Sequence, residues 1–96
     1  AEAVRWLRLA AEQGHANGMS YLGAMYGSGN GVPQDYVQAH MWRSLAVSRD
    51  TSANQDIAVE ARDALANRMT PRQLAEAQYL VREWEAAHPV NHQPPP

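Results

Sequence analysis

The chain has 96 residues, enough for one small domain with a modest core, and its net charge is −2. That charge and the lack of a basic cluster argue against nucleic acid or an anionic membrane as partner. No apolar run is long enough for membrane insertion, and the absence of cysteine excludes disulfides and thiolate-bound metals. All the basic residues are arginine, a bias typical of GC-rich bacterial genomes. The sequence does not decide between a periplasmic and a cytoplasmic location.

Residues 2–13 predict a first helix, which Gly14 ends. Four apolar residues recur at the three- and four-residue spacings of one helix face, which we expect to point inward: Ala3, Trp6, Leu7 and Ala10. Because the sequence begins inside this helix, we expect it to be a piece of a longer protein. Trp6 and Leu7 would then lack the neighbouring hairpin that covers them, so we expect self-association through residues 3–11.

A second helix is predicted from His15 or Ala16 to Tyr26. Gly18 and Gly23 lie inside it, at positions where a neighbouring helix could come close.

Three glycines follow at alternate positions, Gly27, Gly29 and Gly31, and this spacing predicts a loop that visits positive φ repeatedly. Pro33 and Asp35 are typical of a helix start. The third helix is predicted over residues 36–49, with these residues inward: Ala39, Trp42, Leu45 and Ala46.

The first and third helices share a pattern. Ala3-x-x-Trp6-x-x-Leu9-Ala10 recurs as Ala39-x-x-Trp42-x-x-Leu45-Ala46. Self-similarity at such a spacing indicates a solenoid of stacked helical hairpins.

Two further helices are predicted in residues 50–87. Ser52 and Gln55 have the spacing of a capping box, and a stripe at four-residue steps follows: Ala53, Ile57, Ala61, Leu65 and Met69. Thr70-Pro71-Arg72-Gln73 is a second capping box, and it starts a helix that ends near Ala87 with these residues inward: Leu74, Ala77, Val81 and Trp84. Residues 88–96 form a proline-rich tail, a candidate surrogate ligand because polyproline segments are already extended.

Two motifs resemble a known repeat. Leu22-Gly23-x-x-Tyr26, followed by Gly29-x-Gly31-Val32-Pro33-Gln34-Asp35-Tyr36-x-x-Ala39-x-x-Trp42, is similar to the Sel-one-like repeat, a relative of the tetratricopeptide repeat. Ala10-Ala11-Glu12-Gln13-Gly14-His15-Ala16 matches the junction between two such repeats, whereas Gly18 and Ser20 depart from the usual pattern.

The resemblance implies an all-α fold, a right-handed α-solenoid of antiparallel helical hairpins with about five helices. We expect a repeat domain over residues 1–87, composed of a half repeat (1–14), a full repeat (15–50) and a closing hairpin (51–87), followed by the tail (88–96).

The resemblance also implies a function: non-catalytic binding of a protein or peptide, or scaffolding, within a larger bacterial protein. By analogy with tetratricopeptide units, a partner-binding groove would be lined by Asn17, Ser20 and Ala24, with Ser28 at its rim. No cofactor is implied. A cell-wall-associated hydrolase and a purely structural spacer are the alternatives. A closed pocket of polar residues with shifted pKa values would favour the enzyme, and an open groove would favour binding.

The histidines suggest no metal site or catalytic base. His15 is explained as a turn residue. His40 lies two residues before Trp42 on the third helix and is expected at the surface or packed at an edge. His88 and His92 are four residues apart, but Pro89 breaks the helix that would place both on one face. A triad of Ser28, Asp35 and His15 lacks the strand–turn–helix elbow and oxyanion donors that such chemistry needs.

Overall fold

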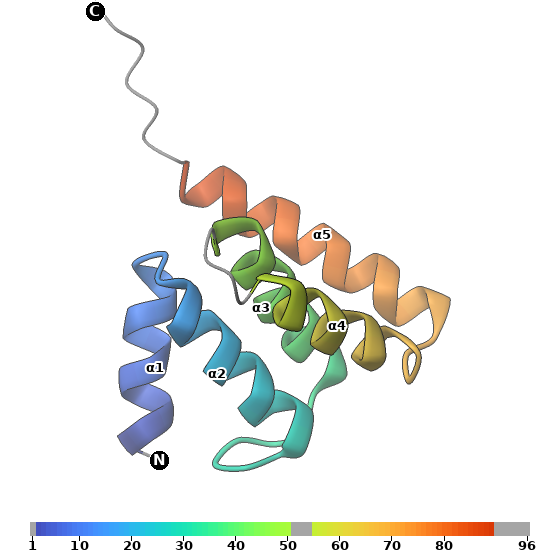
Figure 1. Ribbon diagram of the computed structural model, residues 1–96, viewed down its shortest axis with the longest axis horizontal. Helices are drawn as coiled ribbons and strands as arrows, with labels where there is room; N and C mark the ends of the chain where they lie inside the picture. The colour runs from blue at the N-terminus through green and yellow to red at the C-terminus, as the bar shows by residue number, and fades with distance from the viewer. Residues whose placement is uncertain (1, 51–54, 90–96) are drawn as a thin grey trace, which may run out of the picture.

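The computed structural model describes residues 2–50 and 55–89, which fold into five α-helices (Figure 1). In chain order they are α1 (Glu2–Glu12), α2 (Ala16–Ser28), α3 (Tyr36–Arg49), α4 (Gln55–Ala66) and α5 (Pro71–Ala87). The predicted all-α fold with five helices is confirmed. None of these helices combines the length and apolar character that a bilayer crossing requires. The capping box expected at Ser52, the stripe residue Ala53 and the tail from residue 90 lie outside the described residues.

Helix α3 is central: it packs against α2, α4 and α5, while α1 packs against α2 (Figure 1). All the residues that the sequence predicts to point inward from α3 are buried: Ala39, Trp42, Leu45 and Ala46. Their partners in the core include Met19 and Leu22 of α2, which are completely buried. Because three helices pack on α3, its buried face is wide.

The loop between α2 and α3 follows the glycine prediction at two of three positions. Gly29 has a φ of 77° and ends α2, with its N–H donating to the Met25 carbonyl at 2.8 Å. Gly31 also has a positive φ, of 84°. The prediction for Gly27 is wrong, because α2 continues to Ser28 and Gly27 lies inside the helix.

Residues at the far end of this loop bond back to α2 and extend it. The Gln34 side-chain amide donates to the Gly27 carbonyl at 2.9 Å, and the Asp35 N–H donates to the Tyr26 carbonyl at 2.9 Å. These bonds satisfy carbonyls that a helix end otherwise leaves unpaired, which explains why the helix runs further than expected. The Asp35 carboxylate then accepts from the Gln38 N–H at 3.1 Å and caps α3, as its position in the sequence suggested.

Two glycines of α2 let helices approach closely, as expected. A Cβ at Gly23 would lie 2.9 Å from Cγ of Arg43 and 3.1 Å from the Ala39 carbonyl oxygen, both on α3. A Cβ at Gly18 would lie 2.8 Å from Cβ of Ala10 on α1. These distances are shorter than van der Waals contact, so only glycine permits this spacing of α2 and its neighbours.

The start and inward face of α5 agree with the prediction. The Thr70 hydroxyl accepts from the Gln73 N–H at 3.1 Å, and the Gln73 side chain accepts from the Thr70 N–H at 2.9 Å, with Pro71 at the first helical position. Ala77 and Trp84 are buried, and Leu74 and Val81 are half-buried.

The face of α1 that the sequence predicted to point inward is not its buried face, although Trp6 is uncovered, as expected where no neighbouring hairpin covers it. Val4 and Ala11 are its buried residues, whereas the Trp6 side chain is 65% exposed. The only helix packed closely on α1 within the described residues is α2, so one narrow face is covered and the larger apolar side chains stay outside.

The stripe predicted on α4 is also only partly buried. Met69, just after the helix, is buried, and Ala61 and Leu65 are half-buried, but Ile57 is 66% exposed. Helix α4 has α3 as its principal neighbour, so a single packing contact leaves most of its surface uncovered.

The C-terminal end of α5 reaches the turn between α1 and α2. The Trp84 ring stacks on the His88 ring with centroids 3.9 Å apart, and the Arg49 guanidinium lies 4.8 Å from the Trp84 ring centroid. Nε2 of His88 lies 3.4 Å from a carboxylate oxygen of Glu12. This cluster connects the last described helix to the first.

Replacing Trp84 with alanine should lower the free energy of unfolding by about 3–5 kcal/mol, the range for emptying a buried aromatic site. Trp84 is 8% exposed and meets Trp42 edge-on, with ring centroids 6.1 Å apart. The matched control is Tyr79→Ala on the same helix, because that side chain is 52% exposed and its loss should cost within about 0.5 kcal/mol. Urea unfolding measures both, and equal losses would contradict this account of α5.

Candidate functional site

Two adjoining hollows, each of about 300 Å³, lie between α2 and α4. Arg43 of α3 and Ala61 of α4 line both, so we treat them as one surface, the α2–α4 groove. The groove is lined by Asn17, Ser20, Tyr21, Ala24, Gly27, Ser28, Tyr36, Arg43, Asp50, Ile57, Ala58, Ala61, Ala64, Leu65 and Arg68.

All four groove residues named from the sequence line this surface. Asn17 and Ser20 lie in one hollow, and Ala24 and Ser28 lie in the other. Their spacing of three, four and four residues places them along one face of α2, so the helix presents them as a row. Asn17 provides an amide, the two serines provide hydroxyls, and the small side chain of Ala24 leaves space between them.

The opposite wall comes from α4, and sequence reasoning missed it. Ile57, Ala61 and Leu65 face the groove, although their four-residue spacing had suggested a core stripe. The spacing itself was a correct sign of one apolar face. It could not tell whether that face is covered by the protein or open at its surface.

Arg43 lines both hollows of the groove and, with Arg68, gives it positive charge; sequence reasoning missed this residue as well. The residue is half-buried, and burial lowers the pKa of its guanidinium from its usual value. It forms no ion pair with the residues that the structure describes. Asp50 lines the same hollow as Arg43. A cation that is partly removed from water favours anionic groups as its neighbours.

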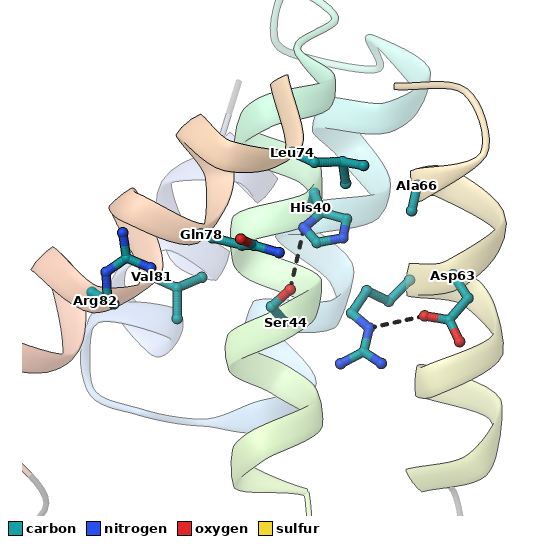
Figure 2. Close-up of a pocket in the computed structure, with 9 residues that line it drawn as sticks. His40, Ser44, Asp63, Ala66, Leu74, Gln78, Val81 and Arg82 are labelled. Atoms are coloured by element: carbon teal, nitrogen blue, oxygen red, sulfur yellow. Dashed lines mark hydrogen bonds and ion pairs between the residues drawn. The ribbon is translucent and has the colours of Figure 1, made fainter. Parts of the chain in front are cut away.

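A larger hollow of about 610 Å³ lies on the other side of α4, between α4 and α5 (Figure 2). We call it the α4–α5 cavity; it is lined by His40, Ser44, Arg62, Asp63, Ala66, Leu74, Gln78, Val81 and Arg82. Figure 2 shows His40 and Ser44 of α3 at its base, with Gln78 of α5 reaching toward them and Asp63 and Ala66 on the opposite wall.

His40 is buried, which corrects the expectation that it lies at the surface or an edge. Its position on α3 faces the space between α4 and α5, and both helices cover it. Nδ1 of the ring lies 3.3 Å from the Ser44 hydroxyl. Burial lowers the pKa of His40, the nearby Arg62 charge lowers it further, and Asp63 partly opposes that shift. The imidazole is therefore held in its neutral form.

The side chains once considered for catalysis have local structural partners. The Ser28 hydroxyl donates to the Met25 carbonyl at 3.3 Å, and the Asp35 carboxylate caps α3. His15 is exposed at the start of α2, which agrees with its prediction as a turn residue. Across residues 2–50 and 55–89, no group of three or more histidine or acidic side chains is arranged to hold a metal ion. His92 lies outside those ranges.

Helix α1 carries a third surface. Trp6 is 65% exposed and Leu9 is 48% exposed. A shallow hollow of about 540 Å³ beside them is lined by Val4, Arg5, Arg8, Leu9 and Glu12. Large apolar side chains gathered on one uncovered helix are typical of a contact surface.

The Sel1 repeat family matches residues 1–15 and 16–50, more than half of the chain, in two successive segments. The chain belongs to the Sel1 repeat family. No curated protein and no solved structure matches it. Sel1 repeats belong to the tetratricopeptide-like superfamily, generally act as protein-interaction scaffolds and are typically non-catalytic; the family match identifies no catalytic domain in this chain.

The first matched segment contains α1, and the second contains α2, α3 and the glycine loop between them. One wall of the α2–α4 groove and its Arg43 therefore come from the matched Sel1 repeat. The other wall, α4, lies beyond the match, as does most of the α4–α5 cavity.

Stability of this Sel1 repeat module should fall as the pH drops from 7 to 5, and His40 should account for part of the loss. Its pKa in the folded protein lies below the usual 6.5, so the unfolded chain binds a proton that the folded chain resists. The stabilisation is complete above pH 6.5 and is lost as the pH falls toward the pKa of the folded state.

The comparison is between wild type and His40→Gln, which cannot titrate and keeps a group able to bond to Ser44. Urea unfolding at a series of pH values should give a shallower pH dependence for the variant. An equal pH dependence of the free energy of unfolding for the two proteins would show that His40 has the same pKa in the folded and the unfolded state.

Proposed function

We propose that this Sel1 repeat module is a non-catalytic scaffold that binds a segment of another protein in the α2–α4 groove. One observation carries the proposal: Asn17 and Ser20 on α2 and the exposed Ile57 on α4 face a common hollow that is also lined by the half-buried Arg43. The groove is open, as binding of a chain segment requires.

The lining indicates the chemistry of the partner. The Asn17 amide can both donate to and accept from a peptide backbone, and Ser20 adds a hydroxyl. Ile57 offers an apolar contact, since burying such a side chain is worth about 1.5–3 kcal/mol. Arg43 favours an acidic residue. A peptide with an acidic residue next to an apolar one fits these three contacts.

The two alternatives from the sequence have less support. A hydrolase needs a base, and His40 in the α4–α5 cavity is the nearest candidate. Its ring partner Ser44 is one helical turn away on the same helix, an arrangement that helix geometry alone produces. A structural spacer needs neither an uncovered isoleucine nor a half-buried arginine in an open groove.

The double variant Asn17→Ala/Ser20→Arg tests the groove. Peptides containing Asp or Glu, and a synthetic peptide of residues 88–96, are titrated against it and against wild type by calorimetry. Loss of two backbone hydrogen bonds and the added bulk of arginine should weaken binding by about tenfold or more.

The matched control is Asn67→Ala/Ser48→Arg, which makes the same changes at exposed positions away from the groove. It should bind like wild type. Binding that is equal in both double variants would show that the groove is not the site.

We also propose self-association through α1. Two copies that bury Trp6 and Leu9 against each other would cover the largest apolar side chains left exposed on this helix. Light scattering over a concentration series should show a dimer that Trp6→Ser/Leu9→Ser weakens by at least tenfold. Tyr79→Ser, on an aromatic of α5 that is 52% exposed, should leave the dimer unchanged. A wild-type protein that stays monomeric at millimolar concentration would refute the proposal.

A further inference from the structure

The α4–α5 cavity is independent of the groove and lies on the opposite side of α4. Its volume of about 610 Å³ is within the range of sites for small organic molecules. Helices α4 and α5 both pack on α3, and the side chains between them do not fill the space. The hollow is open to solvent, so a small molecule can enter it from the surface.

The walls of the cavity carry more positive than negative charge. Arg62 comes from α4 and Arg82 from α5, while Asp63 supplies the one carboxylate among the lining residues. Asp63 accepts a hydrogen bond from Nε of Arg62 at 3.2 Å, which leaves the two terminal nitrogens of that guanidinium without a bond to the described residues. Arg82 forms no ion pair with residues 2–50 or 55–89.

The base of the cavity offers neutral hydrogen-bonding groups, and its sides are apolar. His40 and Ser44 lie at the base, and Figure 2 shows the amide of Gln78 turned toward them. Apolar contacts come from Ala66, Leu74 and Val81. Guanidinium groups bind carboxylates through paired hydrogen bonds, and the single Asp63 disfavours a second negative charge on the ligand.

We propose that the α4–α5 cavity binds a small organic monocarboxylate, with its carboxylate on the free terminal nitrogens of Arg62 and its apolar part against Leu74 and Val81, while Arg82 adds positive charge at the rim. Gln78 and Ser44 hydrogen-bond the remaining polar atoms of the ligand. The site is separate from the proposed peptide groove, so each can fail without the other.

Benzoate is the probe, because it joins one carboxylate to an apolar ring of suitable size. Benzamide, which has the same shape without the charge, is its neutral match, and sodium chloride keeps the ionic strength constant. Benzoate should shift the backbone amide resonances of Ser44 and Gln78 in a saturable way, and benzamide should not. Equal effects of the two probes, or no saturable shift with benzoate, would overturn the proposal.

The variant Arg62→Gln should weaken benzoate binding by about tenfold, since it removes a charged hydrogen-bond donor, and Arg82→Gln should weaken it by a smaller factor, since it removes a charge at the rim. Arg72→Gln is the matched control: it removes an exposed arginine of α5 that does not line the cavity, and it should bind like wild type. Arg82 is exposed, so its variant should fold even if Arg62→Gln does not. Equal weakening by Arg72→Gln would reduce the effect to general charge attraction and refute a defined site.

The groove variant Asn17→Ala/Ser20→Arg provides the last comparison. It should bind benzoate with wild-type affinity, because its substitutions lie on the far side of α4. Loss of benzoate binding in this variant would place the carboxylate in the groove and overturn the assignment to the α4–α5 cavity.

Discussion

One helix, α3, is shared as a packing partner by α2, α4 and α5, and the other features of the structure depend on that arrangement. It is possible because α3 buries a wide face and because α2 comes close to it at Gly23. Trp42 fills the centre, and Trp84 covers it from α5. Helices that gain their stability from a common partner need little contact with one another.

The open surfaces on both sides of α4 follow from this. Because α4 relies on α3, space remains beside it toward α2 and toward α5. The two spaces differ in chemistry: the groove combines a row of small polar residues with an apolar wall, whereas the cavity has an arginine on each wall and a neutral histidine at its base. A single helix therefore separates two surfaces that suit different classes of ligand.

Much of the fold could be predicted from the sequence, because helix ends are set locally. The capping residues Asp35 and Thr70 act within one turn of themselves, and the structure has both helices where these residues indicate. The side of a helix that is buried depends on distant neighbours. The exposure of Ile57 and the burial of His40 were missed because apolar spacing defines a face without saying what covers it. The polar row of the groove was found by family resemblance, whereas Arg43 carried no signal in the sequence.

The contact between His88 and Glu12 has a consequence for folding. In an open array of helical repeats each unit touches only the next, so the ends can fray independently and unfolding need not be all-or-none. Here the end of α5 returns to the turn after α1 through His88, Trp84 and Arg49. Such a closure between distant parts of the chain couples the first hairpin to the last, which favours a cooperative transition in a protein that is otherwise built from local contacts.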